Sequence, residues 1–289
     1  MSILRPIRRV FINKATGVLP FVAVLVVACA GESRRPTFVA SIEPVGMILR
    51  ELVGDRGEVH VLLPPGASPH TYEPKPSDAR YAEDALAMFY VALEVDGWAA
   101  KLAGDRVNPI GDLSEPAGDD DHHHNPHVWL DPLAVRERVP AICDALIQAD
   151  PAGANVYRAN ADRFITDLIQ LDLTLQSLLE PVRGKAVIQA HASWDLFLAR
   201  YGIEIAGVIE STPGASLPPR KLARLVDAVS EGRVVALIAE PQLPRAPLET
   251  LAGHGASIVE LDPLGGGPGM TTYAELILGN ATRLADAAT

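Results

Sequence analysis

A long helical stretch between two similar halves of the chain limits the folds open to it. Residues 151–180 hold apolar side chains at helical spacing: Val156, Phe164, Ile165, Leu168, Leu171, Leu175, Leu178 and Leu179. We expect Asp150 to cap this helix and Pro181 to end it. A helix of ~30 residues is roughly 45 Å long, longer than most globular helices. A coiled coil is the alternative, but the repeat is not a clean heptad. The stretch therefore predicts a linking helix over 150–181.

Short apolar runs alternate with helical patterns on both sides of the linking helix. The predicted strands are 37–42, 59–63, 87–92, 186–190, 203–208, 234–239 and 257–261. Strands that alternate with helices indicate parallel sheets. A chain of 289 residues also exceeds one typical core. We expect an α/β fold with two lobes, 36–149 and 182–289, each with a mostly parallel sheet flanked by helices.

The first 28 residues are predicted to be an export signal. Four basic residues precede an apolar run, 18–28, that is too short to cross a bilayer core of ~30 Å. The run ends at Cys29 in a sequence that resembles a bacterial lipobox, which predicts that Cys29 carries a lipid anchor. A plain signal peptide that happens to contain a cysteine is the alternative. Either signal places the mature protein outside the cytoplasmic membrane, in the periplasm or at the cell surface.

Composition and charge exclude two classes of protein. The chain is 48% hydrophobic and 21% charged, which excludes wholesale disorder. Its net charge of -11 argues against a nucleic-acid partner, because phosphate binding requires a clustered basic surface. The second cysteine, Cys143, lies in an apolar helical pattern and is expected to be a small buried side chain without a disulfide.

Four metal-binding side chains follow predicted strands or strand–helix units: His70, His127, His191 and Asp262. Two come from each half, and ligands of parallel sheets sit beyond the carboxyl ends of the strands. We therefore expect all four at a metal site in the cleft between the lobes. Three imidazoles and one carboxylate suit Zn²⁺ first and Mn²⁺ second. Each residue alone has an ordinary alternative as a loop, capping or turn residue.

Other polar residues leave more than one interpretation open. Glu240 ends a buried strand and is a ligand, a neighbour that orients a ligating histidine, or a strand-end carboxylate, with the second favoured. His60 and His254 are expected to be structural. An auxiliary metal loop and a solvated loop are equal alternatives for the tract Asp119, Asp120, Asp121, His122, His123 and His124.

Five segments make the chain similar to a known family. They are 63–74 (LPPGASPHTYEP), 125–132 (NPHVWLDP), 191–194 (HASW) leading to Tyr201-Gly202, 239–242 (AEPQ) and 261–264 (LDPL). The chain resembles the ZnuA/TroA-like metal receptors of ABC importers over its whole mature length. The resemblance implies two lobes on a rigid linking helix, with His70, His127, His191 and Asp262 as ligands. It also implies a monomer that works with an ABC permease and its ATPase. Manganese members commonly have Glu at the third histidine, so His191 favours zinc.

These observations favour capture of a metal over catalysis. A secreted zinc hydrolase would need an open metal position and a general base, and Glu240 is the one candidate. The chain has neither an HExxH motif nor a Gly-x-Ser-x-Gly elbow. A surface adhesin or a metallochaperone without a transporter remains a third class.

Overall fold

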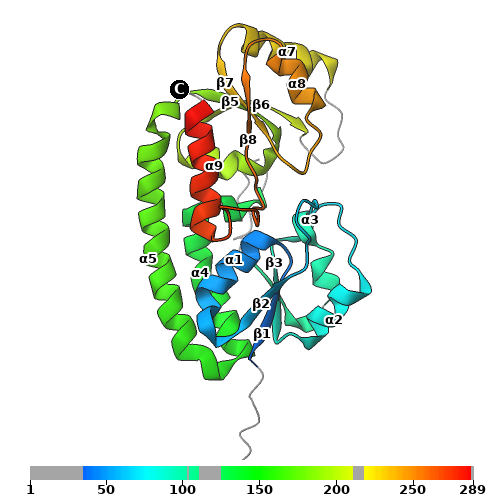
Figure 1. Cartoon of the computed structure of the whole chain (residues 1–289), viewed down its shortest axis with the longest axis vertical. Coiled ribbons are helices and arrows are strands. Elements are labelled where there is room, and N and C mark those ends of the chain that lie inside the picture. Colours follow the sequence, from blue (N-terminus) through cyan, green and yellow to red (C-terminus); the bar gives the residue numbers. More distant parts are fainter. Residues whose placement is uncertain (1–34, 103, 111–124, 211–217, 288–289) are drawn as a thin grey trace, which may run out of the picture. The chain divides into compact units, whose positions relative to one another are not determined.

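The computed structural model describes residues 35–102, 104–110, 125–210 and 218–287. Residues 35–289 form one compact unit (Figure 1). The predicted signal, Cys29 and the tract from Asp119 to His124 lie outside the described residues. Within the described ranges, no helix has both the length and the apolar character that a bilayer span requires.

The first sheet has four parallel strands in the order β2-β1-β3-β4. The strands are β1 (Thr37–Ala40), β2 (Glu58–Val61), β3 (Ala87–Tyr90) and β4 (Val107–Pro109). The helices of this lobe are α1 (Glu43–Val53), α2 (Pro76–Asp84) and α3 (Leu93–Asp96). Strand β4 was not predicted, since three residues that end in proline carry little strand signal.

The second sheet repeats this arrangement in the order β6-β5-β7-β8, again with parallel strands. Its strands are β5 (Ala186–His191), β6 (Glu204–Glu210), β7 (Val234–Ala239) and β8 (Ser257–Glu260). The helices are α6 (Asp195–Arg200), α7 (Pro219–Ser230), α8 (Ala246–Ala252) and α9 (Tyr273–Ala287). The predicted fold class of two parallel sheets flanked by helices is confirmed.

Two long helices join the halves: α4 (Pro132–Ala149) and α5 (Ala154–Leu179). Helix α5 is shorter than predicted, because residues 151–153 form a separate 3-10 turn. Asp150 does not cap the helix through its side chain. Its two carboxylate oxygens instead accept hydrogen bonds from Arg56, each 2.8 Å long. A bidentate contact with a guanidinium is stronger than the single hydrogen bond that a capping carboxylate would accept from a backbone amide.

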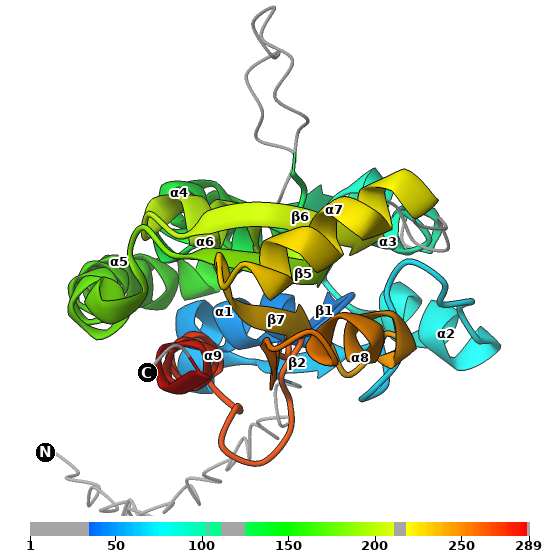
Figure 2. The ribbon, with the colours of Figure 1, turned by 90° about the horizontal axis from the view of Figure 1, so that it is seen from above.

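Helix α5 builds a core that the two sheets share. Its buried face packs against α1, α4 and α9, and α9 lies beside it in both views (Figures 1 and 2). The largest buried apolar cluster extends from Phe38 and Phe89 through Leu168 to Val187 and Ile238. Because this core is continuous, the lobe boundaries at 149/150 and 181/182 stay an interpretation. Cys143 belongs to the same cluster, with a free thiol.

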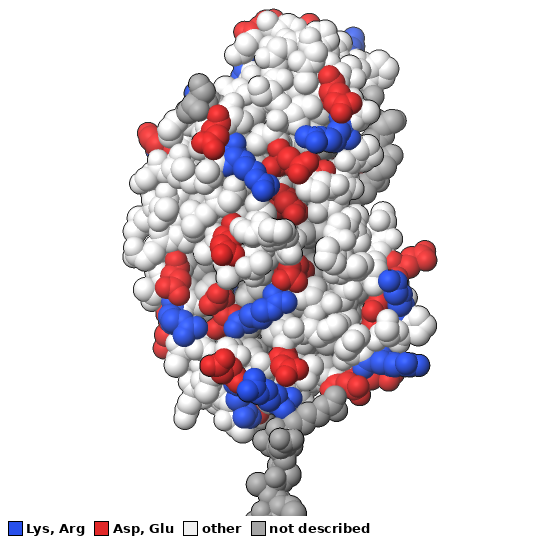
Figure 3. Space-filling model, viewed as in Figure 1, with Lys and Arg blue, Asp and Glu red and all other residues white. Residues whose placement is uncertain are grey.

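Two polar contacts connect the halves near the ends of the sheets. Asp131 accepts hydrogen bonds from the first backbone amides of α4 and forms an ion pair with Arg200 of α6. Asn125 donates a 2.6 Å hydrogen bond to the carbonyl oxygen of Ala192. On the face shown in Figure 3, basic side chains lie among acidic ones and form no continuous basic patch.

Candidate metal centre

His70 lies in the proline-rich loop that follows β2. The loop is attached to the segment after β3, since Trp98 Nε1 donates a 3.0 Å hydrogen bond to the carbonyl oxygen of Pro69. The Nδ1 atom of His70 lies 3.2 Å from the carbonyl oxygen of Glu94. A carbonyl can only accept, so this contact places the proton on Nδ1. The lone pair of Nε2 is thereby left for a metal.

His127 precedes a 3-10 turn, residues 128–130, that leads into α4. The side-chain oxygen of Asn125 accepts from the backbone N–H of His127 at 2.9 Å and from its Nδ1 at 2.8 Å. The Asn125 amide cannot turn over easily, because its nitrogen donates to Ala192 on the other half. This network again places the ring proton on Nδ1 and leaves Nε2 as the free nitrogen.

His191 is the last residue of β5 and is buried. A hydrogen bond with the backbone of Glu210, its register partner on β6, raises the pKa of His191, but burial lowers that pKa by more. Its Nε2 atom is buried and has no hydrogen-bond partner within the described part of the chain. A buried polar atom without a partner is uncommon in folded proteins, so this nitrogen is suited to bind a metal ion.

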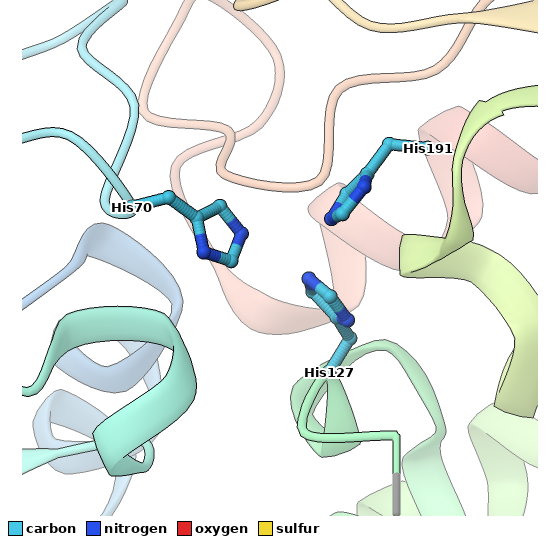
Figure 4. A group of neighbouring side chains, drawn as sticks. All are labelled: His70, His127 and His191. Atoms are coloured by element: carbon cyan, nitrogen blue, oxygen red, sulfur yellow. The ribbon is translucent and has the colours of Figure 1, made fainter. Parts of the chain in front are cut away.

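The three imidazoles converge on one point (Figure 4). Each offers a ring nitrogen, and the three nitrogens lie within 4.8 Å of one another. The ring centroids are 5.8 Å apart for His70 and His127, 5.3 Å for His70 and His191, and 5.1 Å for His127 and His191. Two nitrogens bound to one tetrahedral zinc are about 3.3 Å apart. Small ring rotations are therefore enough to bring all three nitrogens onto one ion.

Burial keeps the three imidazoles in their neutral form. Desolvation is the largest cause that lowers the pKa of His70, His127 and His191. The effect is greatest for His127, whose pKa lies well below its ordinary value, and the other two rings lower it further. Only a neutral imidazole can bind a metal through its lone pair, so little proton release is needed at neutral pH.

A cavity of about 30 Å³ lies beside the rings. Its volume suits one ion or one water molecule rather than an organic ligand. The walls come from both halves of the chain, and besides the histidines they include Ser68, Pro69, Trp129, Ser193, Glu240, Gln242, Leu243, Pro263 and Leu264.

Asp262 lies next to this cavity but outside the group of three histidines. Its Oδ1 accepts hydrogen bonds from Gln242 Nε2 and from the backbone N–H of Leu264, both 3.0 Å long. Asn280 of α9 holds the backbone of Asp262 at both ends. The Asn280 side chain accepts from the Asp262 N–H and donates to its carbonyl oxygen, at 2.8 Å each.

Glu240 lines the cavity and is buried. Burial raises its pKa to about 8, and the negative charge of Asp262 also acts in that direction. Glu240 therefore holds a proton at neutral pH. Ser193, two residues after His191, donates a hydrogen bond to Glu240 Oε1. The contact that the structure shows for Glu240 is thus with Ser193 rather than directly with a histidine.

Asn125, Gln242 and Asn280 were not predicted from the sequence as residues of the site. Asn125 and Gln242 do fall in two of the short segments that carried the resemblance, so a signal for them existed. Asn280 lies in an amphipathic helix, where one asparagine gives no local signal. His60, which was expected to be structural, stacks on Tyr81 with ring centroids 3.6 Å apart.

Comparison with known families agrees with this fold. Residues 38–287 match the family described as zinc-uptake complex component A, periplasmic (ZnuA). This match covers most of the chain, so the protein belongs to the ZnuA family of metal-binding receptors.

Among the relatives that match over most of their length, some are named for zinc and others for manganese. The manganese-binding lipoprotein MntA of Halalkalibacterium halodurans is 27% identical, over 91% of this chain and 94% of the relative. The high-affinity zinc uptake protein ZnuA of Paracoccus denitrificans is 28% identical, over 90% and 94% respectively. A putative metal-binding protein of Thermotoga maritima is 30% identical, over 87% and 92%.

Solved structures have the same fold. A crystal structure of ZnuA superposes with a TM-score of 0.77 at 28% identity, covering 88% of this chain and all of that one. The laminin-binding protein Lmb of Streptococcus agalactiae, described as a bifunctional protein with adhesin and metal transporting activity, has a TM-score of 0.78 at 25% identity. The superposition covers 89% of this chain and all of the Lmb chain.

Proposed function

We propose that this protein captures Zn²⁺ outside the cytoplasmic membrane and delivers it to an ABC permease. Three neutral imidazoles on separate elements converge beside a cavity of single-ion size, and this observation carries the proposal. The buried, unpartnered Nε2 of His191 supports it, because a metal ion would supply the missing partner. Asp262 is proposed as the fourth ligand, drawn in from the adjacent segment when the ion binds.

The choice of zinc rests on the type of ligand. Three imidazole nitrogens and one carboxylate are the set that tetrahedral zinc prefers, whereas manganese prefers more oxygen ligands. Relatives named for zinc and for manganese are both similar to this chain, so Mn²⁺ is the competing cargo.

Delivery to a permease rests on the family and on the predicted export signal. We propose that Cys29 carries a lipid that keeps the protein at the membrane, as a monomer beside the permease and its ATPase. The protein acts by capture and not by catalysis. A complete shell of four protein ligands would leave no metal position for a reactive water, and the family is one of transport receptors.

Calorimetric titration of the metal-free protein with Zn²⁺ tests the proposed site. We expect one tight site in the wild type and a loss of at least about 100-fold in affinity for His127→Ala, since one ligand is removed. His60→Ala is the matched control, because His60 lies on β2 and stacks on Tyr81 outside the group of three. Unchanged zinc affinity in His127→Ala would rule out the site.

Delivery is tested separately in cells that lack this receptor. Zinc uptake should return with the wild-type gene and not with His127→Ala, and it should require the permease. Uptake that does not depend on the permease would favour an adhesin or a metallochaperone instead.

A further inference from the structure

We propose that Gln242 restricts Asp262 to a single bond with the metal and thereby favours Zn²⁺ over Mn²⁺. The inference rests on the proposed function and adds a specificity-determining residue to it. Gln242 follows β7 and lines the cavity beside the histidines.

Both donors to the Asp262 carboxylate use the same oxygen. Gln242 Nε2 and the backbone N–H of Leu264 each lie 3.0 Å from Oδ1. A carboxylate oxygen has two lone pairs in the plane of the group, so two donors fill Oδ1. Among the described residues, no hydrogen bond is found to Oδ2. Oδ2 is therefore the oxygen that Asp262 can offer to an ion.

The Gln242 amide must point its nitrogen, and not its oxygen, toward the Asp262 carboxylate. A reversed amide would turn its carbonyl oxygen toward the carboxylate, and two acceptors repel each other. With Nε2 bound to Asp262, the oxygen Oε1 is left buried and without a partner in the described chain. A structural glutamine would be expected to satisfy both ends of its amide. This unsatisfied oxygen indicates that the role of Gln242 is to hold the Asp262 carboxylate and not to stabilise the fold.

The backbone of Asp262 has little freedom to change this arrangement. Asn280 is fully buried and bonds to both the N–H and the carbonyl oxygen of Asp262. The same Asn280 amide also donates to the carbonyl oxygen of Leu276 within α9, which anchors it. Because the main chain is fixed, Asp262 can approach the ion only by movement of its side chain. In the proposed bound form, Oδ1 keeps its two hydrogen bonds while Oδ2 turns toward the ion.

One oxygen and three imidazole nitrogens give a four-coordinate ion. Zinc accepts tetrahedral coordination readily, whereas manganese favours higher coordination with more oxygen ligands. Removal of the Gln242 amide frees one lone pair of Oδ1, so both carboxylate oxygens can then bind. The fifth bond should benefit Mn²⁺ more than Zn²⁺.

The test compares the wild type with Gln242→Leu, a change that removes the amide and keeps similar bulk. Competition titrations with Zn²⁺ and Mn²⁺ measure both dissociation constants. We expect Mn²⁺ to bind about tenfold more tightly in Gln242→Leu, with zinc affinity changed less than about threefold. X-ray absorption of the zinc-loaded proteins should show four ligands in the wild type and an added oxygen in the variant.

Gln176→Leu is the matched control. Gln176 Nε2 donates to Asp172 Oδ2 at 2.8 Å on helix α5, so this variant removes the same type of bond away from the cavity. The ratio of its zinc affinity to its manganese affinity should equal that of the wild type. The inference is overturned if Gln242→Leu has the same ratio of zinc affinity to manganese affinity as the wild type. It is also overturned if that ratio falls only because zinc binds more weakly. Absence of tight zinc binding in the wild type would instead overturn the proposed function.

Discussion

Trp129 Nε1 donates a 2.7 Å hydrogen bond to the carbonyl oxygen of Pro263. This bond joins the segment that carries His127 to the segment that carries Asp262. Tyr273 strengthens the connection, because its hydroxyl donates to the carbonyl oxygen of Trp129 at 2.9 Å. Two stretches more than a hundred residues apart are thus held in fixed positions beside the cavity.

Trp129→Phe should lower both stability and zinc affinity. The change leaves a small void and removes the partner of a buried carbonyl group, a loss of about 1–3 kcal/mol in the free energy of unfolding. We expect zinc affinity to fall about tenfold because the Asp262 segment is no longer held. Urea denaturation and zinc titration measure the two effects.

Trp194→Phe provides the comparison. Trp194 is also fully buried, but its Nε1 has no partner within the described residues. This variant makes the same change in volume without breaking a hydrogen bond. An equal loss in both variants would show that volume alone matters at Trp129.

Zinc affinity should begin to fall at a lower pH than it would in a site built from histidines with the ordinary pKa. The pKa values of His70, His127 and His191 are all lowered, with burial as the largest cause. Protons therefore compete with zinc only below the ordinary histidine pKa of 6.5. Titrations from pH 7.5 to 5.0 should show nearly constant affinity down to about pH 6.5 and a steep fall below it. A fall that begins near pH 7.5 contradicts this expectation.

Glu240→Gln should stabilise the metal-free protein at alkaline pH. The pKa of Glu240 is raised from 4.5 to about 8 in the folded protein. Between these values the folded state holds more protons than the unfolded state, so the stability contributed by this group falls as pH rises. Glutamine does not titrate, and the variant should gain about 1–3 kcal/mol over the wild type between pH 5 and pH 8.5.

Denaturation at several pH values, with chelator present, measures this difference. The exposed Glu73 gives the control variant Glu73→Gln, which makes the same chemical change outside the residues that line the cavity. A pH-independent effect of Glu240→Gln would mean that Glu240 is already ionised in the folded protein.

Deletion of Asp119 to His124 should leave the tight site intact. The tract lies outside the described residues, and the three converging histidines come from other segments. Calorimetry on the deletion variant should retain one tight zinc site and lose weaker binding if the tract holds metal. Loss of the tight site would mean that the tract supplies one of its ligands.

The sequence predicts the positions of His70 and His191 because both follow from strand direction. His191 ends a strand of the second sheet and His70 follows a strand of the first, and ligands of parallel sheets lie beyond the carboxyl ends of the strands. The alternating βα pattern and the linking helix were likewise local signals. These features depend on residues close together in the chain.

The contacts that position the carboxylates could not be predicted in this way. Asp150 lies 94 residues from Arg56, and a local capping rule therefore failed at Asp150. The hydrogen bond from Gln242 to Asp262 spans 20 residues across two strand ends, and no periodicity signals it. Ligand type is local information, whereas the orientation of a ligand depends on tertiary packing.

Helix α9 is synthesised after every other described element, yet it supplies Tyr273 and Asn280. In a growing chain, the segment that carries Asp262 is therefore complete before the helix that holds its backbone. Zinc should be held poorly at that stage, because the proposed fourth ligand is not yet fixed beside the histidines. A chain stopped at residue 272 should release zinc in dialysis under conditions where the full chain keeps it. Zinc would then be held tightly only once the last helix of the described chain is in place.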